Sequence, residues 1–172
     1  MKLKGLWLAP MLLFPAIAWG QGAQAQAKPD LTVHYDVMTT NVAAIAEPGE
    51  KERWIANTDL WEIKLAEAGT IAEAELDKMT ESLDRIKTNV AKVTDAAEKE
   101  RWEANVQLWQ MLIGQKGVFA KGDADKLKDP FERMKANVAG IAVAAEKERW
   151  QANRDMWQVL IDRASAEVGM SR

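Results

Sequence analysis

A segment of 48 residues occurs three times in succession in this chain, and this repetition constrains the fold more than any other feature. The copies span residues 29–76, 77–124 and 125–172 without a gap, and eleven positions are identical in all three. Each copy contains Asn-Val-Ala, then Glu-Lys-Glu-Arg-Trp, then Ala-Asn, and then a second Trp. A period of this length is typical of a supersecondary unit that stacks on its neighbours. We therefore expect three similar structural units.

Each unit is expected to contain two helices. Its first half carries apolar residues at helical spacing, such as Met38, Val42 and Ile45, and its second half carries Trp54 and Trp61. On one continuous helix these two sets would face different directions, so a turn must separate them. No segment shows the alternation of a strand. The sequence therefore predicts an all-α fold of three tandem helical-hairpin repeats, about six helices in all, forming a bundle or a short array.

The turn inside each hairpin has different signals in the three copies. In the first copy, Pro48 and Gly49 favour a break within residues 47–50. In the second copy, Asp95 and Glu98 have the spacing of a capping box, which satisfies free backbone N–H groups at a helix start. The third copy has Val143 in the place of Asp95, so only its position in the repeat predicts a break there.

The links between units carry capping signals as well. Thr70 follows a glycine and precedes Glu73 by three residues, so we expect it to cap a helix that runs to about Val93. In the second link, Asp129 followed by Pro130 predicts a helix start, with proline at the first helical position.

The first 27 residues have the three parts of a secretory signal. A basic start with Lys2 and Lys4 precedes an apolar run over residues 6–19, and small-x-small motifs end at Ala25 and Ala27. The run is shorter than the roughly 20 residues that a membrane-spanning helix needs. We expect a cleaved signal peptide over 1–27, a periplasmic protein with no membrane span after cleavage, and one helical domain over 28–172. The alternative is an uncleaved anchor helix.

Composition excludes several function classes. The formal net charge is −3 and becomes more negative once the leader is removed, which disfavours nucleic-acid binding. There is no cysteine and only one histidine, so thiol chemistry and any site with two imidazoles are excluded. The sequence also lacks a Ser/His/Asp set and a phosphate-binding glycine loop. We therefore expect no catalysis, no cofactor and no metal site.

One constellation recurs in every unit. Glu50, Trp54, Asn57 and Trp61 are spaced so that they share one stripe of a helix, with Arg53 beside it. Together with the asparagine of the Asn-Val-Ala motif, this pattern gives the candidate site residues. They are Asn41, Arg53, Trp54, Asn57, Trp61, Asn89, Arg101, Trp102, Asn105, Trp109, Asn137, Arg149, Trp150, Asn153 and Trp157.

Two interpretations of this constellation remain open from sequence. In the first, the tryptophans pack between units, their indole N–H groups donate to asparagine, and an asparagine pair across each hairpin fixes the register. In the second, each unit displays the same Trp-Asn-Arg-Glu surface to a partner. The positions of three tryptophans distinguish the two interpretations. Packing predicts that Trp54, Trp102 and Trp150 are buried between units, whereas a binding surface predicts that they line an open groove.

These features lead to two functional hypotheses. The first is an exported, non-enzymatic helical-repeat protein that serves as a protein-interaction or assembly module, with a protein partner or with itself. The alternative is a periplasmic binding protein that holds a small apolar or aromatic ligand, or a soft metal, through the repeated constellation.

Overall fold

The computed structural model describes residues 31–67, 69–120 and 122–166, and this part of the chain contains six helices and no strand. The predicted all-α fold is confirmed, while the predicted signal peptide lies outside the described residues. The helices are α1 (Leu31–Val42), α2 (Pro48–Ala66), α3 (Glu73–Val90), α4 (Ala96–Gly114), α5 (Ala124–Val138) and α6 (Ala144–Ala166).

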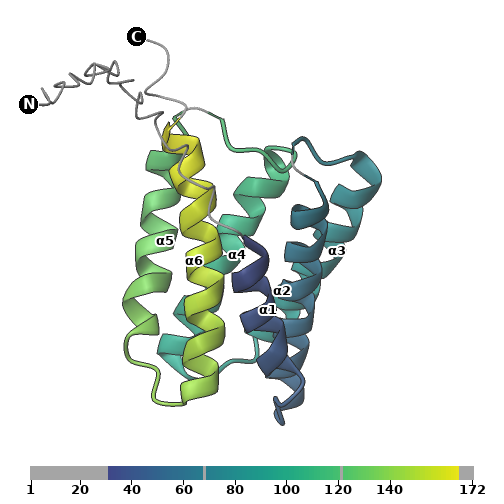
Figure 1. Ribbon diagram of the computed structural model, residues 1–172. Helices are drawn as coiled ribbons and strands as arrows, with labels where there is room; N and C mark the ends of the chain where they lie inside the picture. The colour runs from purple at the N-terminus through teal and green to yellow at the C-terminus, as the bar shows by residue number, and fades with distance from the viewer. Residues whose placement is uncertain (1–30, 68, 121, 167–172) are drawn as a thin grey trace, which may run out of the picture.

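The six helices form a closed bundle (Figure 1). The tryptophan-bearing helices α2, α4 and α6 meet at the centre through their side chains, and α1, α3 and α5 pack outside them. Each outer helix packs most extensively on the inner helix that precedes it, so α3 lies on α2 and α5 lies on α4. No inner helix precedes α1 in the chain. It packs on α6 instead, which brings the first and last described helices together. The architecture is therefore a ring of units and not an open array.

The predicted turns inside the hairpins are present, with one shift of position. Glu47 caps α2 by accepting hydrogen bonds from the backbone N–H groups of Gly49 and Glu50, and Pro48 occupies the first turn. Pro48 therefore begins the helix and does not break it, because a proline in the first turn leaves no intrahelical hydrogen bond unmade. The predicted Asp95 cap is confirmed, since its carboxylate accepts from the backbone N–H of Glu98 at 2.7 Å.

Both helix starts predicted in the links are wrong. Ala72, and not Thr70, occupies the N-cap of α3, without a side-chain cap, and α3 ends at Val90. In the second link α5 begins at Ala124, so Pro130 lies inside the helix and is buried. The sequence signal at Pro130 was misleading because α5 accommodates the buried proline ring in its interior, although proline cannot donate the helical hydrogen bond at that position.

The two links pack against each other at one end of the bundle. Ile71 donates its backbone N–H to the Lys116 carbonyl at 2.8 Å, and the Ile71 and Phe119 side chains are buried there. After α4 the backbone N–H groups of Lys116 and Gly117 bond back to Ile113 and Leu112, which is the Schellman arrangement. Gly117 then has φ +84° and lies directly beneath Ile71.

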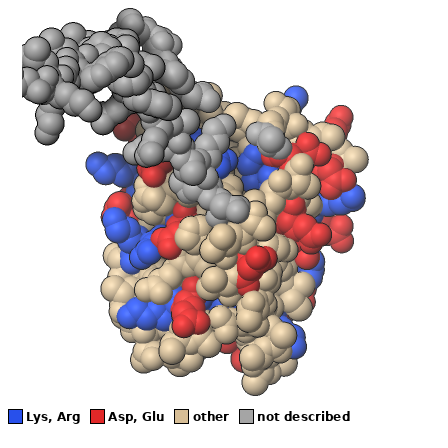
Figure 2. Space-filling view, in the orientation of Figure 1, with Lys and Arg blue, Asp and Glu red and all other residues tan. Residues whose placement is uncertain are grey.

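No helix in the described ranges is long and apolar enough to cross a membrane. Basic and acidic side chains are interspersed over the face shown in Figure 2, and acidic groups gather over the region of α2 and α3.

The contact at Gly117 yields a stability prediction. A Cβ added at Gly117 would lie 2.4 Å from two side-chain carbons of Ile71, and the positive φ disfavours any L side chain. Replacing Gly117 with Ala should lower the free energy of unfolding by about 1–3 kcal/mol. Gly114→Ala is the matched control, because its Cβ would meet nothing within 4 Å, and it should be neutral or slightly stabilising. Urea unfolding followed by circular dichroism measures both, and equal effects would contradict this packing.

Candidate functional site

The recurring constellation lies along the axis of the bundle in successive layers. Each layer takes one equivalent side chain from α2, α4 and α6, so the stripe predicted from sequence faces the centre. All six tryptophans of the stripe are at most 1% exposed, and the three central asparagines are fully buried. From one end to the other the layers are Glu50, Glu98 and Glu146 with their arginines; Trp54, Trp102 and Trp150; Asn57, Asn105 and Asn153; and Trp61, Trp109 and Trp157.

The asparagine layer is a closed ring of amides. Asn105 donates to Asn57 at 2.9 Å, Asn153 donates to Asn105 at 3.0 Å, and Asn57 donates to Asn153 at 3.1 Å. Each side chain thus donates once and accepts once within the ring. Because buried amides are costly when unpaired, this cyclic arrangement is what allows three of them at the centre of an apolar core.

The lower tryptophan layer uses the remaining acceptor capacity of the ring. The indole Nε1–H groups of Trp61, Trp109 and Trp157 donate to Asn153, Asn57 and Asn105 at 2.8, 2.9 and 2.9 Å. Every central Oδ1 atom therefore accepts two hydrogen bonds. The three indoles also contact one another, with ring centroids 4.6–4.9 Å apart. Edge contacts of this kind add stabilisation beyond the area that they bury.

The second N–H of each central amide distinguishes the repeats. Asn57 and Asn153 direct theirs to the sulfur atoms of Met38 and Met134, at 3.4 and 3.6 Å. The equivalent residue in the second repeat is Ile86, which offers no acceptor. Thioether sulfur is a weak acceptor, so the difference between repeats is small in energy.

In the upper tryptophan layer the three indoles pack directly on one another. Trp54, Trp102 and Trp150 contact one another edge to face, with centroids 4.8–5.0 Å apart. The buried Nε1–H groups of Trp54 and Trp102 have no hydrogen-bond acceptor within the described ranges. In such a layer, the electron-rich faces of the neighbouring indoles are the surfaces toward which these N–H groups can point.

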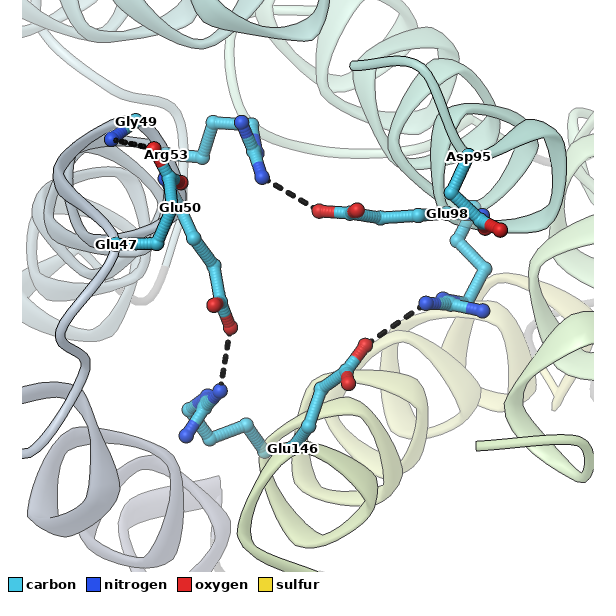
Figure 3. A network of polar contacts seen from close by, with 9 residues as sticks. Glu47, Gly49, Glu50, Arg53, Asp95, Glu98 and Glu146 are labelled. Atoms are coloured by element: carbon cyan, nitrogen blue, oxygen red, sulfur yellow. Dashed lines mark hydrogen bonds and ion pairs between the residues drawn. The ribbon is translucent and has the colours of Figure 1, made fainter. Parts of the chain in front are cut away.

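A ring of alternating arginine and glutamate closes this end of the bundle (Figure 3). Each arginine lies over the indole of the next inner helix, 5.5–5.7 Å from its centroid, and is only 5–6% exposed. The buried guanidinium groups are thereby paired with both a charge and an aromatic face. The ion pairs are Arg53 to Glu98 at 2.5 Å, Arg101 to Glu146 at 2.8 Å, and Arg149 to Glu50 at 2.6 Å.

The asparagines of the Asn-Val-Ala motif lie outside the axial ring. Asn89 and Asn137 are half-buried and donate to the carbonyls four residues earlier, at 3.0 and 3.1 Å, and Asn41 reaches Glu148 at 3.3 Å. The asparagine pair expected across each hairpin is therefore wrong. These residues lie near the C-terminal ends of the outer helices, at the level of the arginines, whereas Asn57 lies two layers further along the axis. The pairing occurs among the three inner helices instead.

Arginine salt bridges connect α3 and α5 to the inner helices on which they pack. Arg85 on α3 bonds to Glu52 and Asp59 on α2, both at 2.8 Å. Arg133 on α5 makes the equivalent bond to Glu100 on α4, at 2.7 Å. The equivalent position on α1 is Val37, which is exposed. The contact between α1 and α6 therefore lacks the arginine salt bridge that the α3–α2 and α5–α4 contacts have.

Burial raises the pKa of the Glu146 carboxyl above its ordinary value. Repulsion from Glu50 and Glu98 acts in the same direction, while Arg101 and Arg149 oppose it. The three carboxylates of the ring are thus close enough to influence one another. Within the described ranges, however, no group of three or more histidine or acidic side chains is arranged to hold a metal ion.

The arrangement leaves the repeated chemistry engaged inside the molecule. The tryptophan, asparagine and arginine side chains of the inner helices contact one another across all three units. A ligand held by them would have to displace these contacts. The buried residue Lys64 lies outside the candidate set. It flanks the stripe in the sequence and continues the spacing of Glu50 and Asn57 by a further seven residues, and it is buried at the other end of the axis. That spacing is the signal that identifies it.

No protein-family model matches the chain, and comparisons with curated proteins and with solved structures found no significant match.

The amide ring predicts unequal roles for two asparagines of the repeat. Asn57→Ala removes the acceptor of Asn105 and Trp109 and should lower the free energy of unfolding by about 3 kcal/mol or more. Asn89→Ala removes only a half-buried bond within its own helix and should cost less than about 1 kcal/mol. Guanidinium unfolding followed by tryptophan fluorescence compares the two variants. Similar losses for both would rule out the ring as the main constraint.

The raised pKa of Glu146 predicts a pH dependence. A folded-state pKa above the ordinary value of 4.5 means that the folded protein binds more protons just above that pH. The contribution of Glu146 to stability is therefore largest at low pH and is lost as pH rises through the folded-state pKa. The stability of the native protein minus that of Glu146→Gln should fall as the pH rises from 4.5 through the folded-state pKa. Chemical unfolding at several pH values measures the difference, and a rise with pH would refute the assignment.

Proposed function

We propose that this chain is an exported, non-enzymatic helical bundle that acts as a protein-interaction or assembly module. The observation that carries this proposal is the burial of the repeated polar and aromatic side chains, which are paired with one another around the axis. The side chains that the three units share are therefore engaged in the core. Contact with a partner is left to the outer surface of the bundle, which includes the exposed faces of α1, α3 and α5.

The outer helices are not equivalent on that surface. On α1, Val33 and Val37 are 59% and 41% exposed and lie one turn apart. Exposed apolar side chains gathered on one face are typical of an interaction surface. The residues at the equivalent positions of the other outer helices are charged: Glu81 and Arg85 on α3, and Asp129 and Arg133 on α5. This difference supports α1 as the helix that contacts a partner.

Export is the other part of the proposal. The basic start, apolar run and small-x-small motifs of residues 1–27 support secretion with cleavage after Ala25 or Ala27. Mass spectrometry of the protein from the cell envelope measures the mature N-terminus and compares it with that of the full chain.

Site-specific photo-crosslinking in cells that export the chain tests the interaction surface. A photoreactive phenylalanine analogue at position 33 should capture a protein, and the same analogue at position 81 on α3 should not. Val37→Arg installs the residue that α3 carries at the equivalent position and should abolish the product while the far-ultraviolet circular dichroism stays unchanged. The mass of the product distinguishes a second copy from another protein. Absence of a product at 33, or equal products at 33 and 81, would overturn the proposed docking surface.

A further inference from the structure

A half-enclosed cavity of about 130 Å³ lies at the end of the bundle opposite the arginine–glutamate ring. Leu112 and Leu160 form part of its apolar wall, and Phe119 from the second link lies against both the cavity and the Trp157 indole. Lys64 and Arg163 also line it. The cavity thus combines an apolar wall with two cationic side chains.

Lys64 is an unusual residue for its position. The equivalent residues of the other repeats are Leu112 and Leu160, so one amine replaces a leucine in an otherwise apolar layer. Lys64 is only 8% exposed, and its Nζ donates to the Glu67 carbonyl at 3.0 Å. An ammonium group has three N–H donors, so this one bond leaves capacity for a further acceptor.

Arg163 adds a second positive charge to the same cavity. No carboxylate of the described ranges forms an ion pair with either Lys64 or Arg163. Burial lowers the pKa of the Lys64 amine and repulsion from Arg163 lowers it further, while the Glu67 charge opposes both. Two cations face this cavity, and neither has an ion-paired carboxylate in the described part of the chain. An anion bound between them would reduce their mutual repulsion.

We propose that this cavity binds a small molecule with an anionic head group on an apolar body, of the class of medium-chain carboxylates. The head group lies between Lys64 and Arg163, and the apolar body lies against Leu112, Leu160 and Phe119. Because only the first repeat carries lysine at this position, the chain has one such site and not three. The site is independent of the outer surface of α1, so the two proposals succeed or fail separately.

Sodium octanoate is the probe, with acetate and 1-octanol as the matched ligands that lack the tail or the charge. Isothermal titration of the full mature chain should show saturable 1:1 binding of octanoate, and much weaker binding of acetate and octanol. Carbon-13 NMR of Lys64 Cε should show that octanoate raises the pKa of the amine, whereas octanol should not. Absence of saturable octanoate binding, or an unchanged Lys64 pKa at saturation, would overturn the proposal.

The repeat supplies variants that preserve the fold. Lys64→Leu and Arg163→Gln install the residues found at the equivalent positions of other units, so both should unfold cooperatively like the native chain. Each should weaken octanoate binding about tenfold or more, because each removes a charged partner of the head group. Lys92→Leu removes an exposed positive charge at the opposite end and should leave binding unchanged. Undiminished binding in Lys64→Leu would place the octanoate elsewhere and refute the site.

Discussion

The interior of this bundle depends on the requirement that buried amides be paired. Three asparagines lie in one layer of an apolar core, and their donors and acceptors are satisfied only when all three inner helices are present. Each ring oxygen also accepts an indole N–H, so the amide layer fixes the orientation of the tryptophan layer next to it. Register along the axis and the number of inner helices therefore follow from the same hydrogen bonds.

Cooperativity follows from this geometry. In an open array each unit contacts only the units next to it, so units fold semi-independently. Here every unit contributes to every axial layer and contacts both of the others. The buried arginines strengthen the coupling, because each guanidinium spans from one inner helix to the glutamate and the indole of the next. Loss of any inner helix would leave unpaired polar groups in the asparagine layer and in the arginine–glutamate ring.

Sequence reasoning predicted the helices, the Asp95 cap and the stripe of Trp54, Asn57 and Trp61, because these depend on local periodicity and capping. It did not predict which helices pack together. The phase of an apolar stripe shows that a face is buried but does not identify the neighbour that covers it, so closure of α1 on α6 required three-dimensional information. The same limit explains the incorrect asparagine pairing across the hairpin. Asn57 faces two equivalent residues at distances of 48 and 96 positions, beyond the reach of local patterns.

The direction of the amide ring has a consequence for the order of the chain. The hydrogen bonds pass from each inner helix to the next in one rotational sense and return to the starting helix, so the core has no first or last member. The contacts within the axial layers do not depend on which inner helix comes first in the sequence. A circularly permuted chain, in which the present termini are joined and new ones open within the link after α2 or α4, would present the same core. The connectivity of this protein is thus one of several that its interior accommodates, as expected of three equivalent parts packed in a ring.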